Sequence, residues 1–301
     1  MYLNIKSVLS IYGELIKAKQ TILLLYTAIF SYLISVVELS QPFNWFVFPH
    51  LLLSLFLAVS GATVLNMYLD RDIDAIMERT KDRPLPSGRV SASTVLINGI
   101  VLTSLGILIA FLTLGWLTAL VIFFGFFFDV VIYTIWLKRR TKFSIIFGGI
   151  AGGLPAMAGR IVVLVIAGKF PLDEVGMEFL LFILAWIPVH ILTLALLPKN
   201  FDGYKKAKIP MWPVVSSEKQ TMRVIALGAV VSFMTLYRIA HLLKASAIIR
   251  IIIFICDLLL LFLVVQNLVK PSNKRTFTIF KIASLFMIVG FLLLYLGLFP
   301  R

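Results

Sequence analysis

The chain has 301 residues, of which 60% are hydrophobic, and a mean hydropathy of +1.02. Soluble globular domains are only about 45–50% apolar, so this composition excludes a soluble protein, as well as a disordered or collagen-like one. The 28 Lys and Arg exceed the 14 Asp and Glu, an excess that we attribute to loops on one side of a membrane rather than to nucleic-acid binding, and a single cysteine excludes an intrachain disulfide.

Apolar runs recur along the whole sequence, each near the length of about 20 residues that crosses a bilayer as a helix. We predict nine membrane-spanning helices, over residues 21–39, 47–69, 94–112, 115–137, 143–167, 177–197, 222–243, 247–269 and 277–298. Pro155 and Pro188 fall inside predicted spans, where we expect each to kink its helix. The prediction is therefore an all-α integral membrane protein, with residues 1–301 forming a single multi-span domain.

The segments between the predicted spans differ in charge. Most Lys and Arg lie in one set of segments, namely the N-terminus and residues 70–93, 138–142, 198–223 and 270–276. The positive-inside rule places this set in the cytoplasm, so the N-terminus is expected inside, and the odd number of spans leaves the C-terminus outside. The first 20 residues contain no recognisable signal or transit peptide, which favours the cell membrane of a prokaryote.

Acidic residues are scarce, yet five of them crowd into thirteen positions at the end of the second predicted span: Asp70, Asp72, Asp74, Glu78 and Asp82. Asn66, Asp70 and Asp74 are four residues apart, so they project from one helix face. Asp72 faces the other way, and we expect it in a salt bridge. Three oxygen donors on one face suit a hard cation such as Mg²⁺. The alternative, a solvated acidic helix end, is disfavoured by the helix dipole and by the cost of polar groups in an apolar span.

Basic residues follow directly, in a loop that two prolines and a glycine fold back over the helix end. They are Arg79, Lys81, Arg83 and Arg89, and a second cluster, Lys138 to Lys142, includes Arg139. Carboxylates for a metal beside guanidinium groups for oxyanions are what a diphosphate–Mg²⁺ site needs. The alternative is that these residues only set the orientation in the membrane, which on charge alone we favour for the second cluster.

Three later positions carry weaker signals. Arg160 lies deep in an apolar span, where an arginine is expected to face a polar cavity or an anionic ligand. His190 lies near the end of the sixth span, either as a ligand or as a hydrogen-bonded structural histidine. Asp202, in the loop after that span, is a candidate for a second metal position facing the first acidic cluster.

Taken together, these motifs resemble a known family. The pattern Asn66-x-x-x-Asp70-x-x-x-Asp74 is similar to the first aspartate-rich motif of the UbiA superfamily of intramembrane prenyltransferases, whose members have nine transmembrane helices. Five further segments resemble the branch of this superfamily that farnesylates haem: Met77–Leu85, Tyr133–Thr141, Gly148–Gly159, Trp186–His190 and Ala207–Met211.

The resemblance implies a reaction in which farnesyl diphosphate alkylates a vinyl group of haem B with the help of Mg²⁺. The metal ligands that it implies are Asn66, Asp70, Asp74 and Asp202, with Asn200 as an alternative to Asp202 because the second motif is displaced by one position. The residues expected to neutralise the leaving diphosphate are Arg79, Arg83, Lys138 and Arg139. Those expected to bind or orient haem are His190, Arg160, Tyr133 and Tyr204.

The same reaction needs a dry cavity, whose expected aromatic wall consists of Phe124, Phe126, Phe127 and Phe128. Membrane lipid and assembly factors of haem–copper oxidases are the further partners expected, and nucleic acid is not. A related prenyltransferase acting on a quinone precursor or an archaeal ether lipid remains an alternative, although it would lack the Met77-x-Arg79-Thr80 pattern and His190. A multi-span transporter is a second alternative, but its charges would lie near the midplane of several spans rather than at one membrane face.

Overall fold

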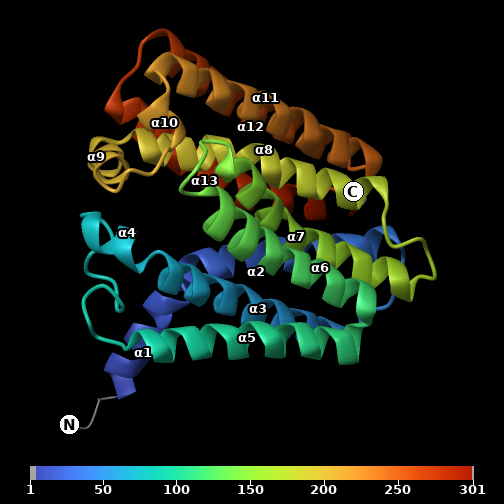
Figure 1. The fold of residues 1–301 in the computed structure, drawn as a ribbon. Coiled ribbons are helices and arrows are strands. Elements are labelled where there is room, and N and C mark those ends of the chain that lie inside the picture. The colour runs from blue at the N-terminus through green and yellow to red at the C-terminus, as the bar shows by residue number, and fades with distance from the viewer. Residues whose placement is uncertain (1–4, 300–301) are drawn as a thin grey trace.

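The computed structural model describes residues 5–299, and within that range it contains helices and no strand (Figure 1). Nine helical segments in the range are long and apolar enough to span a bilayer, so the chain is an integral multi-pass membrane protein. They are α2 (Ala18–Glu38), α3 (Val47–Leu69), α5 (Ala92–Leu114), α6 (Trp116–Phe126) continued by the π-helix η1 (Phe127–Leu137), α7 (Ser144–Ile166), α8 (Glu174–Leu196), α11 (Glu218–Leu242), α12 (Ala247–Val269) and α13 (Asn273–Leu296). The predicted all-α fold is confirmed, and each predicted span coincides with one of these segments to within a few residues.

Four short helices were not predicted: α1 (Ile5–Leu15), α4 (Arg71–Ile76), α9 (Pro198–Lys206) and α10 (Trp212–Val215). They gather with the long loops at one end of the bundle, which we call the α4–α9 end (Figure 1, left). The described part of the chain begins at this end and finishes at the opposite one, as an odd number of spans requires.

The starts of several helices are explained by polar caps. Side-chain oxygens of N-cap residues accept hydrogen bonds from backbone N–H groups in the first turn, which would otherwise lack partners. These caps are Ser91, Asp173, Ser217, Ser246 and Ser272. At the start of α11, Ser217 and Gln220 form a reciprocal capping box, so the span begins four residues earlier than its apolar run predicts.

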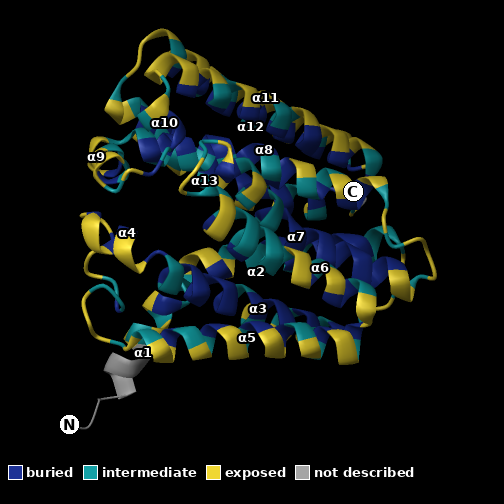
Figure 2. Ribbon diagram, in the orientation of Figure 1, coloured by how far each residue is buried: buried dark blue, intermediate teal, exposed yellow. Residues whose placement is uncertain are grey.

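Small residues let the helices pack closely in the centre of the bundle. A Cβ atom at Gly61 of α3 would lie 2.4 Å from the backbone nitrogen of Thr103 in α5, and one at Gly159 of α7 would lie 2.5 Å from the carbonyl oxygen of Ala28 in α2. Within a membrane, such close approach replaces much of the hydrophobic driving force between helices. α7 is the most deeply buried span and lies between α2 and α8 (Figure 2).

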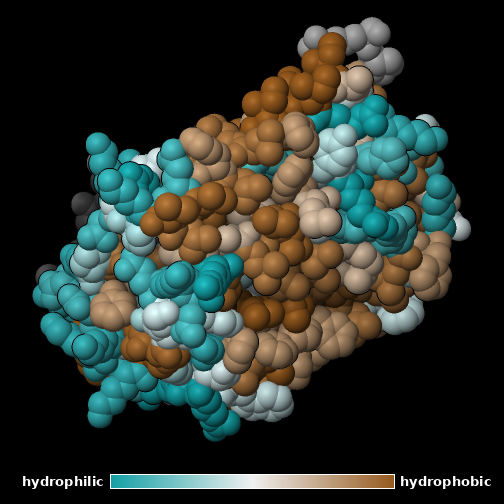
Figure 3. Space-filling view, turned by 90° about the horizontal axis from the view of Figure 1, so that it is seen from above, coloured by the Kyte–Doolittle hydropathy of each residue, from teal (hydrophilic) through white to brown (hydrophobic). Residues whose placement is uncertain are grey.

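The outer surface has the polarity of a membrane protein. Large apolar side chains are exposed along the outer faces of the spans, for example Leu112, Leu227 and Phe262. The space-filling view shows apolar atoms over the middle of the molecule and hydrophilic atoms toward its two ends, most extensively at the α4–α9 end (Figure 3, left). Lipid is the natural environment of such a surface.

The second half of the fourth span is a π-helix, which was not predicted. Its wider turn brings residues five apart onto one side, and Oγ1 of Thr134 lies 3.0 Å from the carbonyl oxygen of Asp129. π-Helical turns are rare and often lie at functional sites. The polar side of η1 faces the end of α3.

Candidate active site

Asn66, Asp70 and Asp74 lie together where α3 passes into α4. The helix breaks at Asp70, but its N–H still donates to the carbonyl of Asn66 at 2.9 Å, and the N–H of Asp74 donates to the carbonyl of Asp70 at 2.8 Å. This retained spacing of four residues keeps all three side chains on one side, as their sequence positions predict. They are 7%, 5% and 4% exposed, respectively, so polar groups are concentrated in a buried place. We call these three residues the inner group.

Three aspartates in this region, Asp70, Asp72 and Asp74, each have a basic partner. Lys138 forms an ion pair with Asp70, and Arg83 Nη1 lies 2.7 Å from Asp74 Oδ2. Arg139 instead binds Asp72 on the outer side, with N–O distances of 2.6 and 2.7 Å. The hydrogen bonds from Arg139 lower the pKa of Asp72 to about 2. The structure thus brings Arg83 and Lys138 to the inner group and directs Arg139 away from it.

One carboxylate oxygen of the inner group lacks a partner. Asp70 Oδ1 is buried, and no group in the described part of the chain donates a hydrogen bond to it. An unpaired buried carboxylate oxygen is costly, and a bound cation removes that cost. Across residues 5–299 no three His, Cys, Asp or Glu side chains form a metal-ligand cluster, so a cation here depends on the amide of Asn66 and on substrate oxygens. This combination suits Mg²⁺, which is commonly held by one or two carboxylates plus phosphate oxygens.

Asn66 is held by two residues of η1 that the sequence analysis did not select. Its Nδ2 donates to Asp129 Oδ2 at 2.8 Å, and its Oδ1 accepts from Thr134 Oγ1 at 2.8 Å. Asp129 is the only charged residue between positions 116 and 137, so its isolation in an apolar run was the available signal.

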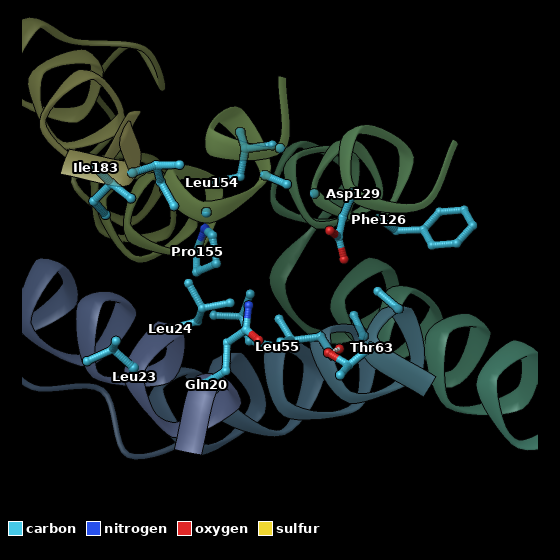
Figure 4. Close-up of a pocket in the computed structure, with 18 of the residues that line it drawn as sticks. Gln20, Leu23, Leu24, Leu55, Thr63, Phe126, Asp129, Leu154, Pro155 and Ile183 are labelled. Atoms are coloured by element: carbon cyan, nitrogen blue, oxygen red, sulfur yellow. Dashed lines mark hydrogen bonds between the residues drawn. The ribbon is translucent and has the colours of Figure 1, made fainter. Parts of the chain in front are cut away.

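A cavity of about 400 Å³ lies beside the inner group (Figure 4): Asn66, Asp70 and Asp74 do not line it, but Asp129, which accepts a hydrogen bond from Asn66, does. Its walls come from α2, α3, α6, η1, α7 and α8 and are largely apolar, with Leu55, Pro155 and Ile183 among them. Polar groups gather on its border, among them Lys19, Gln20, Arg79, Asp129 and His190. The cavity therefore joins a charged site to an apolar chamber. Of the four phenylalanines expected to line it, only Phe126 does so; Phe127 and Phe128 are not among the lining residues, and Phe124 is 39% exposed on the outer surface.

His190 borders the same cavity. Its ring is stacked between Trp186 and Phe280, with centroid distances of 4.5 and 4.7 Å. Nδ1 lies 3.1 Å from the hydroxyl of Ser284, which leaves Nε2 for a ligand. The surrounding contacts hold the ring in one orientation.

Arg160 lies elsewhere. Its guanidinium group is buried at the opposite end of the bundle, where Nη1 is 2.6 Å from Glu38 Oε2 and Nε is 3.1 Å from Asp173 Oδ2. It does not border the cavity, and its charge is already compensated by two carboxylates. Arg160 therefore does face anionic groups, but they are carboxylates of the chain itself rather than a ligand.

Asp202, the expected second metal ligand, is exposed on α9, and the structure does not bring it to the inner group. Its neighbour Gly203 faces inward instead, where an added Cβ would lie 3.1 Å from Cε of Met77. Asn200 is buried, but its Nδ2 donates to the carbonyl of Leu194 at 2.9 Å. Tyr204 is partly buried against the apolar core.

Tyr133 lies beneath Lys138. The Nζ of Lys138 is 5.7 Å from the centre of the tyrosine ring, within the range of a cation–π contact. Gly148 of α7 leaves room for this ring, since an added Cβ would lie 3.1 Å from it. Tyr133 therefore helps to place the lysine that pairs with Asp70.

Lys17 is a further basic residue near the site that the sequence analysis did not select. It adopts a left-handed backbone conformation, with φ of 45°, immediately before α2. Burial, together with the nearby charges of Arg83 and Lys138, lowers the pKa of Lys17 to about 8. Such strain in a non-glycine residue is typical of functional sites.

Comparison with known proteins gives the same picture. A family model described as the UbiA prenyltransferase family matches residues 24–296. Two similar curated proteins are named protoheme IX farnesyltransferase. The one from Archaeoglobus fulgidus is 34% identical over 286 residues, covering 95% of this chain and 97% of the relative. The one from Hyperthermus butylicus is 42% identical over 215 residues, covering 71% of this chain and 68% of the relative.

Solved structures share the fold. One described as a digeranylgeranylglyceryl phosphate synthase superimposes with a TM-score of 0.77 at 21% identity, covering 96% of this chain and 98% of that one. A UbiA homolog from Archaeoglobus fulgidus, bound to GPP and Mg²⁺, has a TM-score of 0.62 at 15% identity and covers 94% of this chain and 99% of its own.

Proposed function

The chain belongs to the UbiA prenyltransferase family, and we propose that it transfers a farnesyl group from farnesyl diphosphate to a vinyl group of haem B. The name shared by curated relatives from archaea and bacteria, protoheme IX farnesyltransferase, supports this choice of substrates. The observation that carries the proposal is the buried inner group, with its unpaired Asp70 oxygen, next to an apolar cavity whose border includes Asp129, the hydrogen-bond partner of Asn66.

Asn66, Asp70 and Asp74 are the residues that would hold Mg²⁺, and the diphosphate would complete the coordination. A UbiA homolog whose structure was solved with GPP and Mg²⁺ supports a divalent cation in this role. When bound, the ion supplies positive charge to the departing diphosphate. Asp202 remains a weaker candidate for a second position, because its exposed side chain would have to turn inward.

The basic residues neutralise the leaving group. Lys138 and Arg83 already lie beside the carboxylates, so they can donate hydrogen bonds to diphosphate oxygens without a large movement. Arg79 borders the cavity and is placed for the same role. The C1–O bond breaks heterolytically, the electron pair leaves with the diphosphate, and an allylic cation remains.

The apolar chamber protects that cation. Walls such as Leu55, Pro155 and Ile183 offer no nucleophile and exclude bulk water. The π-electrons of a haem vinyl group then form the new C–C bond, and water adds to the resulting cation and loses a proton, which gives a hydroxyethylfarnesyl side chain. His190, with Nδ1 held by Ser284, would orient haem through Nε2.

The remaining assignments follow from this function. We place the α4–α9 end at the cytoplasmic face of a prokaryotic cell membrane, with the N-terminus inside and the C-terminus outside, because its loops carry most of the Lys and Arg. Residues 1–301 act as one catalytic domain in contact with lipid. Assembly factors of haem–copper oxidases are candidate partners, since such oxidases use farnesylated haems.

Asp70→Asn tests the metal assignment. The substitution keeps the shape of the side chain but removes its charge, so we expect Mg²⁺-dependent release of diphosphate from farnesyl diphosphate to fall by about 10²–10³-fold, the range for losing one electrostatic stabiliser. Asp72→Asn, an acid two positions away that binds Arg139 outside the inner group, is the matched control and should keep its activity. Near wild-type turnover by Asp70→Asn would show that the inner group does not hold the metal.

A further inference from the structure

Asp129 is an acid without a role in the mechanism above. It is the only charged residue between positions 116 and 137, in the fourth span. Ionisable groups inside membrane spans are costly and are usually retained for function. Its carboxylate points from η1 into the space between η1 and α3, on the border of the cavity (Figure 4).

The contacts of Asp129 determine how the amide of Asn66 is turned. A carboxylate oxygen accepts hydrogen bonds, so the group of Asn66 that lies 2.8 Å from Asp129 Oδ2 must be the NH₂. The hydroxyl of Thr134 donates to Asn66 Oδ1 at 2.8 Å. With both contacts made, the amide has one orientation.

The direction of η1 determines toward which end of the bundle each end of the amide points. The helix runs toward the α4–α9 end, where Lys138 follows it, so Thr134 lies nearer that end than Asp129 does. The amide nitrogen of Asn66 is therefore held on the side of the membrane interior, and its oxygen on the side of the α4–α9 end, toward which α3 continues to Asp70. Mg²⁺ takes oxygen ligands, and an inverted amide would turn its NH₂ toward the cation.

We propose that Asp129 is a positioning residue which, together with Thr134, holds the amide oxygen of Asn66 toward the cation of the inner group. The π-helical turn brings the two residues to bear on one asparagine although they are five positions apart. The inference rests on the proposed function, since it requires a cation at the inner group. Hydrogen bonds behind the ligands of a metal commonly change its affinity by about 10–100-fold.

Binding of Mn²⁺ in the presence of inorganic diphosphate, followed by electron paramagnetic resonance in detergent, provides a readout that does not depend on turnover. Asp129→Ala removes the acceptor and should weaken Mn²⁺ binding by about 10–100-fold. Asp129→Asn offers its own amide oxygen to Asn66 Nδ2, so it should retain most of the affinity. Thr134→Val should weaken binding and Thr134→Ser should restore it. Asp72→Asn is the control for loss of a nearby acid.

The outcomes separate this inference from the proposed function. If the wild-type protein does not bind Mn²⁺ with diphosphate, both fail. If it binds but Asp129→Ala binds equally well, Asp129 does not position Asn66 and only the inference fails. If Asp129→Asn loses as much affinity as Asp129→Ala, the charge acts directly rather than through the amide, and the positioning role is again wrong. Thermal unfolding of each variant distinguishes these results from misfolding.

Discussion

The charged side chains of the site form ion pairs in the substrate-free protein, and in the proposed mechanism their basic members are available to the substrate. Asp70 with Lys138 and Asp74 with Arg83 are neutralised in the substrate-free protein. A buried charge that loses its partner is strongly destabilising, so these pairs keep the site intact before substrate arrives. In the proposed mechanism, a cation that binds the carboxylates would free the lysine and the arginine to face the diphosphate that accompanies it. The pairs therefore account for both the burial of the acids and the readiness of the bases.

Lys17 leads to a prediction about pH. Its pKa of about 8 means that it is positively charged below pH 8 and neutral above it. If Lys17 attracts diphosphate, the wild-type protein should bind Mg²⁺–diphosphate more tightly than Lys17→Met at pH 7, and the ratio of the two affinities should approach one by pH 9. Isothermal titration at both pH values measures this ratio, in which the protonation of diphosphate itself cancels.

Lys244 is a matched control for that experiment. It is also a lysine with a left-handed backbone, with φ of 53°, but it is exposed at the opposite end of the bundle. Lys244→Met should leave the affinity unchanged at both pH values. An equal ratio for Lys17→Met at pH 7 and pH 9 would show that Lys17 does not contribute its charge to diphosphate binding.

Among the elements, α3 has the strictest packing requirement, because it carries the inner group and lies against α5. A Cβ at Gly61 would fall 2.4 Å from the backbone nitrogen of Thr103, which no side-chain rotation relieves. Gly61→Ala should therefore push the two helices apart and destabilise the protein by about 1–3 kcal/mol, the usual cost of overpacking. Thermal unfolding in detergent measures the loss.

Gly13→Ala is the corresponding control. Nothing lies within 4 Å of a Cβ at Gly13 in α1, and alanine is the better helix former, so the unfolding temperature should stay the same or rise. Equal unfolding temperatures for Gly61→Ala and Gly13→Ala would contradict the close packing of α3 and α5.

The spans were predictable from the sequence because lipid imposes a length and an apolar composition on each of them. The π-helix was not, since hydropathy does not distinguish a turn of 3.6 residues from a wider one. Without the π-helix, there was no reason to expect that Thr134 and Asp129 both contact Asn66. Asp129 was nevertheless marked by its isolation in an apolar run, a signal that motif spacing does not include.

Arg160 and the inner group show which contacts could be predicted from the sequence and which could not. Asn66, Asp70 and Asp74 are local in sequence, so helical spacing sufficed to bring them together. The partners of Arg160 are Glu38 and Asp173, which come from the end of another span and from a loop. Such a pairing depends on how the helices pack, so the sequence alone predicted only that Arg160 would face a polar cavity or an anionic ligand. The aromatic wall failed for a related reason, because residues 124–128 turn around a helix: Phe124 faces outward, and Phe127 and Phe128 do not border the cavity.

For the whole molecule, the two ends of the bundle have different tasks. The α4–α9 end combines the inner group, its basic partners and the cavity border, whereas the opposite end holds the buried ion pairs of Arg160. Between them, apolar side chains such as Leu55, Pro155 and Ile183 wall a cavity whose polar border includes Arg79 and Asp129 (Figure 4). This arrangement suits a substrate with an anionic head and an apolar tail.

The central claim is that the chain joins a farnesyl group to haem B, and a product assay tests it most directly. Detergent-solubilised protein would be incubated with haem B, farnesyl diphosphate and Mg²⁺, and the extracted haem identified by mass. We predict a haem carrying a hydroxyethylfarnesyl group, which does not form when EDTA removes the metal. Unmodified haem, together with release of diphosphate and transfer of the prenyl group to a phenolic or glycerol-phosphate acceptor, would contradict the account and assign the enzyme to another branch of its family.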